Sequence, residues 1–109
     1  MPHQGLLITG TDTGVGKTFV GCGLAAALRR KGVRVAPFKP AETGCEMDSQ
    51  SNELVPADAV LLKQASQTDT PLETICPYRF QTPVAPWVAS RLAGEGGEID
   101  PSVLKRCFA

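Results

Sequence analysis

The chain has 109 residues, which is enough for one small hydrophobic core but too few for a complete nucleotide-binding domain with a second domain beside it. Its eleven basic and eleven acidic residues give a net charge of zero, which excludes the basic surface of a nucleic-acid-binding protein and a polybasic membrane patch. No apolar run approaches the roughly 20 residues of a membrane-spanning helix, and no basic, apolar leader opens the chain. We therefore expect a cytoplasmic protein with no nucleic-acid partner and no membrane partner.

The cysteine pattern points to free thiols. Cys22, Cys45, Cys76 and Cys107 form no C-x-x-C pair, and the one histidine, His3, lies next to the N-terminus. Four scattered cysteines in a reducing compartment are best interpreted as unpaired, and a zinc site is not expected. Cys22 falls on the apolar side of an expected helix, so we expect it to belong to the core.

The first part of the chain predicts a strand, a glycine-rich loop, a helix and a second strand. The apolar run Gly5–Thr9 is typical of a buried parallel strand. A helix is expected over Lys17–Lys31, with Gly32 suited to its C-terminal cap. A second strand is expected over Val33–Lys39, ended by Pro40. The expected core face of the helix consists of Phe19, Val20, Gly23, Leu24, Ala27 and Leu28, which recur at three- and four-residue spacing.

The rest of the chain predicts shorter elements. In chain order these are a polar loop over Ala41–Val55, a helix over Ala57–Gln64 entered through Pro56, an extended piece over Cys76–Phe80, a short helix over Trp87–Leu92, and a last helix opened by Asp100 and Pro101. Strand, loop, helix and strand in this order predict a parallel α/β arrangement with a right-handed crossover.

The segment Gly10–Thr18 has the composition of a phosphate-binding loop. Its glycines allow backbone amides to approach phosphate oxygens, and the following helix presents the positive end of its dipole to the same anion. Lys17 can reach the outer phosphates, and the Thr18 hydroxyl can ligate Mg²⁺. The strict pattern has four residues between its first glycine and Gly-Lys-Thr, whereas five separate Gly10 from Gly16. A glycine-rich turn that binds nothing is the alternative, but its position between an apolar strand and a helix favours nucleotide binding.

The departure from the strict pattern is itself informative. Gly10–Thr18 resembles the loop of the dethiobiotin synthetase family, G-T-D-T-x-V-G-K-T. The resemblance continues through Lys39-Pro40, Thr43-Gly44, Asp58-Ala59, and a Pro-Tyr-x-Phe-x-x-Pro-x-x-Pro segment from Pro77 to Pro86. It covers the chain up to about Ser90. This likeness implies a three-layer P-loop NTPase-type α/β fold with a parallel sheet, incomplete in this chain, and makes residues 1–109 the N-terminal portion of a single synthetase domain.

The resemblance also implies a reaction. Dethiobiotin synthetases use ATP and CO₂ or bicarbonate to close a ureido ring on 7,8-diaminononanoate, through a carbamate and a carbamic–phosphoric anhydride, and they release ADP and phosphate. The protein then contributes mainly positioning and charge stabilisation. The implied cofactors are ATP and Mg²⁺, and the implied full-length assembly is a homodimer.

The resemblance assigns roles residue by residue. Lys39 would be the catalytic lysine beside the carbamate and the transferring phosphate, and Lys17 would also act on the phosphates. Thr13 and Thr43 would contact the substrate. Thr18 and Asp58 would bind Mg²⁺. The nucleotide would be held by Gly14, Val15, Gly16, Lys17, Thr18, Phe19 and Asp58.

Each of the three downstream residues also has a plainer interpretation. Lys39 could be a solvated strand end, Asp58 could be an acid that stabilises the start of a helix, and Thr43 could be an ordinary loop hydroxyl. The ordered match favours the functional interpretation of each. Trp87 and Arg91 are interpreted as packing and surface residues.

Other functions remain open at this level. A ParA/MinD-like ATPase has a signature lysine where this chain has Asp12, and a cobyrinic acid diamide synthase relative would carry a further glutaminase domain. A non-catalytic nucleotide-binding remnant is the third alternative. The adenine contacts and a further Mg²⁺ ligand belong to the family's second half, so we expect a truncated chain that is inactive alone.

Overall fold

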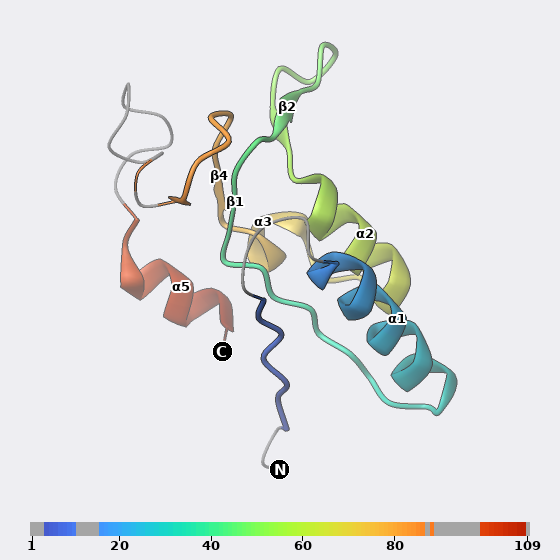
Figure 1. Ribbon diagram of the computed structural model, residues 1–109. Coiled ribbons are helices and arrows are strands. Elements are labelled where there is room, and N and C mark those ends of the chain that lie inside the picture. Colours follow the sequence, from blue (N-terminus) through green and yellow to red (C-terminus); the bar gives the residue numbers. More distant parts are fainter. Residues whose placement is uncertain (1–3, 11–15, 87, 89–98, 109) are drawn as a thin grey trace.

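The structure, a computed structural model, describes residues 4–10, 16–86, 88 and 99–108. Its elements, in chain order, are α1 (Lys17–Arg30), β1 (Ala41–Glu42), β2 (Glu46–Met47), β3 (Leu54–Val55), α2 (Ala57–Ser66), α3 (Leu72–Ile75), β4 (Tyr78–Arg79) and α5 (Pro101–Phe108). In Figure 1, α1 and α2 lie on one side of the strand pair β1–β4, and α5 lies on the other. The predicted α/β class is therefore confirmed, with a short parallel sheet.

The parallel pairing of β1 with β4 is the centre of the fold. Ala41 pairs with Tyr78, and Glu42 pairs with Arg79. Backbone bonds extend the pairing at both ends, and the segment 39–45 thereby runs beside 75–80. These bonds are Lys39 N to Ile75 O (2.9 Å), Tyr78 N to Pro40 O (3.2 Å), Phe80 N to Glu42 O (2.8 Å) and Cys45 N to Phe80 O (3.0 Å). The expected extended piece over 76–80 is thus confirmed as a strand.

The segment expected to be a loop, 41–55, instead contains β1 and the antiparallel hairpin β2–β3. Glu46 pairs with Val55 and Met47 with Leu54. The turn between them is stabilised by Asp48, whose carboxylate accepts bonds from the Gln50 amide and the Ser51 hydroxyl. Such local side-chain bonds form turns without any periodic signal in the sequence, so the hydrophobic pattern alone predicts a loop here.

The two strands predicted around the glycine loop are wrong in this structure. Residues 4–10 and 33–39 lie in no assigned strand. Leu6 is 75% exposed and Leu7 is 92% exposed, so the first segment is not buried either. A parallel strand becomes buried only when both of its faces are covered. One contact of this segment is with α1, where the Ile8 side chain lies 3.5 Å from the position that a Cβ on Gly21 would occupy.

Helix α1 is confirmed, but its buried face differs from the expected one. Phe19 is 85% exposed, and Val20 and Leu24 are exposed as well. The buried residues are Gly21 and Ala25. Both are small and lie four residues apart, so α2 can approach α1 closely along this stripe. A Cβ on Gly21 would lie 3.4 Å from a Leu62 methyl carbon, which shows how close the helices are.

The helix boundaries follow the predicted caps. Gly32 has φ +83° directly after the C-cap of α1, a left-handed conformation that favours glycine. At α5, the Asp100 carboxylate accepts bonds from the Ser102 amide (2.9 Å) and hydroxyl (2.8 Å), which confirms Asp100 as the N-cap. Helix α2 begins at Ala57 as expected and continues to Ser66. The short helix α3 carried no sequence signal.

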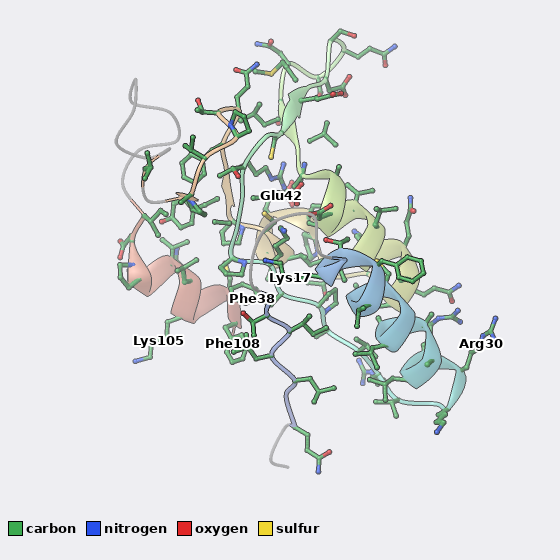
Figure 2. All side chains as sticks on the ribbon, viewed as in Figure 1. Lys17, Arg30, Phe38, Glu42, Lys105 and Phe108 are labelled. Atoms are coloured by element: carbon green, nitrogen blue, oxygen red, sulfur yellow. The ribbon has the colours of Figure 1, made fainter. Side chains whose placement is uncertain are left out.

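The core gathers around the ends of β4. Its fully buried side chains include Phe80, Ile75 and Cys76, with Ala59 of α2 packed against the latter two. Cys22 is only half-buried, so its expected core role is not met. Helix α5 joins the body through an edge-to-face contact of Phe108 with Phe38, at 5.4 Å between ring centroids (Figure 2).

Most of the expected helix over 87–92 lies outside the described residues. None of the helices in the described part of the chain combines the length and the apolar character that crossing a membrane requires.

Candidate functional site

The end of the glycine loop is set by Gly16. Its φ of 97° is left-handed, and it serves as the N-cap of α1. Lys17 begins the helix (Figure 2), and its side chain is exposed. Thr18 is half-buried, and Phe19 is exposed. Among the described residues, neither Lys17 nor Thr18 has a side-chain hydrogen-bond partner. The predicted site residues Thr13, Gly14 and Val15 lie outside the described residues.

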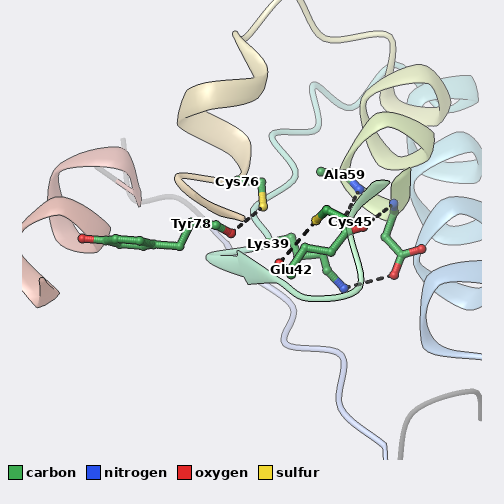
Figure 3. A network of polar contacts seen from close by, with 7 residues as sticks. Lys39, Glu42, Cys45, Ala59, Cys76 and Tyr78 are labelled. Atoms are coloured by element: carbon green, nitrogen blue, oxygen red, sulfur yellow. Dashed lines mark hydrogen bonds and ion pairs between the residues drawn. The ribbon is translucent and has the colours of Figure 1, made fainter. Parts of the chain in front are cut away.

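The structure brings two predicted site residues together. Lys39 Nζ lies 3.1 Å from Asp58 Oδ2, an ion pair between the start of the ladder and the first turn of α2 (Figure 3). Their side chains are 29% and 40% exposed, respectively. Since both groups remain accessible to water, a ligand can reach them and the pair can rearrange.

The sequence analysis does not single out Glu42, which is the only buried charged residue in the part of the chain that the structure describes. Glu42 is only 7% exposed. Its Oε2 accepts a bond from the Asp58 amide and its Oε1 accepts one from the Ala59 amide, each at 3.1 Å (Figure 3). The carboxylate therefore caps α2 from outside the helix. A signal was present, because Pro56 at the N-cap of α2 has no side chain that could bond these amides.

Thr43 and Gly44 occupy the turn after β1. Thr43 is half-buried, and its side chain forms no bond to another described residue. Gly44 has φ +69°, and a Cβ there would meet the Pro83 Cβ at 3.5 Å. The left-handed backbone favours glycine at this position, whereas the 3.5 Å to Pro83 is an ordinary packing distance. Two segments of the family-like pattern, far apart in sequence, are thus in contact.

The charge of Asp58 also acts on α1. Burial raises the pKa of the Cys22 thiol above its usual value, and the negative charge of Asp58 raises this pKa further. Cys22 lies four residues after Thr18, on the same face of the helix. The charge of Asp58 is therefore felt on α1 one turn after Thr18.

Two buried thiols lie along the ladder beside these groups. Cys45 donates to the Glu42 carbonyl oxygen, and Cys76 donates to that of Tyr78. Burial, together with the negative charge of Glu42, raises the pKa of Cys45, and the same causes raise that of Cys76 to about 12. Both thiols are thus neutral at physiological pH and act as small core residues rather than nucleophiles.

Thr18 and Asp58 are of the chemical kinds that Mg²⁺ binds. Mg²⁺ takes one or two carboxylates together with hydroxyl, phosphate and water oxygens, and a dense protein cage is not required. Thr18 and Asp58 supply a hydroxyl and a carboxylate of this kind. No group of three or more potential metal ligands from His, Cys, Asp and Glu occurs among the residues that the structure describes.

A family model described as an AAA domain matches residues 4–106. The chain belongs to this AAA domain family. The match includes the end of the glycine loop, the β1–β4 ladder and the first turn of α2, so the gathered residues all lie inside the family region.

Several relatives of this AAA domain chain are named ATP-dependent dethiobiotin synthetases. The one from Anaeromyxobacter sp. (strain Fw109-5) is 48% identical over 91 residues, which are 84% of this chain and 38% of the relative. Those from Bacillus licheniformis and Aromatoleum aromaticum are each 43% identical over 101 residues, covering 92% and 93% of this chain and 40% and 43% of the relatives. The resemblance found in the sequence is confirmed. The chain spans well under half the length of these relatives.

Proposed function

We propose that this chain carries the phosphate-binding and carbamate-facing part of an ATP-dependent dethiobiotin synthetase. The observation that carries the proposal is the pairing of Lys39 with Asp58, two residues that the family-like pattern marks separately. The identity of 38–48% to enzymes of that name supports it over most of the chain.

The proposed division of labour follows from position and charge. Lys17, with the amides of Gly14, Val15, Gly16 and the start of α1, binds the phosphates of ATP at the positive end of the helix dipole. Thr18 and Asp58 hold Mg²⁺, which when bound neutralises phosphate charge. Phe19 contributes its backbone amide.

Lys39 is the proposed catalytic residue. Negative charge develops on the transferring phosphoryl group and on the carbamate, and a fixed ammonium group stabilises it more in the transition state than in the ground state. Thr13 and Thr43 hold the substrate, 7,8-diaminononanoate, while its amine captures CO₂. The remaining finer features of the proposal are a homodimer, a cytoplasmic location, and residues 1–109 as the N-terminal portion of a single synthetase domain.

The test uses a protein of the relatives' length, in which residues 1–109 replace the matching segment of the Anaeromyxobacter relative. Phosphate release from ATP is measured with and without diaminononanoate and bicarbonate. We expect release that depends on both. Release that ignores diaminononanoate would make a switch-type ATPase the better interpretation.

A further inference from the structure

We infer that Glu42 is a positioning residue of the site: its buried carboxylate fixes the first turn of α2 against the β1–β4 ladder, and so sets where Asp58 lies relative to Lys39 and a bound metal–nucleotide complex. The inference rests on the proposed function, because it takes Asp58 as a residue that serves a divalent metal ion.

Glu42 is a buried carboxylate whose oxygens bond backbone amides. A buried carboxylate is costly unless it is hydrogen-bonded, and Glu42 is only 7% exposed. Among the described residues the only ion pair joins Lys39 to Asp58, so none of their cations forms an ion pair with Glu42. Its charge is instead balanced by two amides at the positive end of α2. Both oxygens are used, one on each amide, so the side chain has a single well-defined position.

Glu42 connects the β1–β4 ladder to the first turn of α2. The backbone carbonyl of Glu42 accepts a hydrogen bond from the Phe80 amide at 2.8 Å, which anchors Glu42 in the ladder. One of the two amides it binds is that of Asp58 itself. Lys39 lies three residues earlier in the same ladder segment, where its amide bonds Ile75. One side chain therefore ties the backbone of Asp58 to the strand that carries Lys39 (Figure 3).

Among the described residues, no hydrogen bond other than those of Glu42 ties the backbone of the first turn of α2 to the ladder, although Ala59 also packs against Ile75 and Cys76. The Lys39–Asp58 ion pair is between flexible, partly exposed side chains, and such pairs hold geometry weakly. Helix α2 has no side-chain cap from its own N-cap residue, Pro56. Removing the carboxylate would leave two amides unsatisfied at the turn that carries Asp58. Removing the carboxylate is therefore expected to destabilise the turn that carries Asp58 more than the rest of the fold.

The first measurement is amide hydrogen exchange in the 109-residue chain, followed by NMR. In Glu42→Ala the amides of Asp58 and Ala59 should exchange about ten-fold faster or more, as expected when a hydrogen bond of roughly 1.4 kcal/mol is lost. Glu46→Ala is the matched control, an exposed glutamate four residues further along. Glu42→Gln keeps the size and one acceptor oxygen, so it should leave one of the two amides protected. The Phe80 amide should keep its protection in both Glu42 variants.

The second measurement uses the protein of the relatives' length, because the adenine contacts and a further metal ligand are expected in the second half. It is Mn²⁺ affinity in the presence of a non-hydrolysable ATP analogue, read from the free Mn²⁺ signal. Residues that orient a metal ligand typically cost 10–100-fold in metal affinity when removed, and we expect a loss of about that size in Glu42→Ala. Glu46→Ala should stay within about twofold of the unsubstituted protein, as surface changes do. Glu42→Ala combined with Asp58→Asn should bind no more weakly than Asp58→Asn alone, since both act through the same group.

Several results would overturn the inference. Unchanged exchange at both amides would mean that the cap is absent. Equal loss of protection at Phe80 would mean that Glu42 only supports the fold. Unchanged Mn²⁺ affinity in Glu42→Ala, additivity with Asp58→Asn, or no Mn²⁺–nucleotide binding by the unsubstituted protein would each remove the positioning role. None of these assays contains diaminononanoate. A chain whose Mn²⁺–nucleotide binding depends on Glu42 therefore sustains this inference even if the synthetase assay fails.

Discussion

Replacing Lys39 by alanine separates a catalytic role from a structural one, because the structure predicts effects of very different size. The ion pair with Asp58 is 3.1 Å long, but its side chains are 29% and 40% exposed. Pairs of this exposure contribute about 0.2–1 kcal/mol to stability. If Lys39 also stabilises charge in the transition state, its loss should lower kcat by about 10²–10³, or roughly 2.7–4 kcal/mol. Activity should thus fall much further than stability.

The assay is diaminononanoate-dependent phosphate release by the protein of the relatives' length, with a thermal melt of each variant. We expect Lys39→Ala to change ATP affinity far less than kcat. Lys39→Gln keeps much of the length and a donor but not the charge, so it should recover little activity. Lys105→Ala, which removes an exposed lysine on α5, is the control (Figure 2). Substrate-dependent release that is as fast in Lys39→Ala as in the parent protein would refute the reasoning.

Three further predictions concern separate parts of the molecule. Lys17→Ala should weaken ATP binding by about 1.5–3 kcal/mol, the value of charged hydrogen bonds, and calorimetry that shows unchanged affinity would remove the loop from the site. Phe80 is 0% exposed, so Phe80→Ala should lower the free energy of unfolding by about 3–5 kcal/mol. Phe19 is 85% exposed, so Phe19→Ala should lower it by about 0.5 kcal/mol or less. Similar denaturation midpoints for the two variants would contradict this. Burial raises the pKa of Cys76 from 9.0 to about 12, so the stability that the neutral thiol contributes is fully present below pH 9.0 and is lost as the pH rises toward about 12. Cys76→Ala should therefore reduce the fall of the unfolding free energy over this pH range, measured by urea titration. An unchanged fall would contradict the prediction.

The sequence predicted elements where the signal was local. The caps of α1 and α5 were found from Gly32 and Asp100, whose preferences depend on their own backbone conformation. The pairing of Lys39 with Asp58 was foreseen only as two separate roles, because a family-like pattern names residues but not the contacts between them.

The predictions that were wrong concern features that depend on contacts between distant segments. The apolar run at Leu6 and Leu7 has the composition of a buried strand, but burial depends on what covers it, and that is a property of the whole structure. The buried stripe of α1 is made by Gly21 and Ala25 because α2 approaches there, which periodicity alone could not specify. Glu42 was missed because its bonds reach residues 16 and 17 positions away.

The β1–β4 ladder also sets the order in which this region can form during synthesis. The bonds from Glu42 to the first turn of α2 need the chain only as far as Ala59. The bond from the Phe80 amide to the Glu42 carbonyl needs it as far as residue 80. Short loops close at lower entropic cost than long ones, and N-terminal parts leave the ribosome first. We therefore expect Glu42 to reach the amides of Asp58 and Ala59 before β4 pairs with β1, so that the site forms from its helix side and is completed by β4.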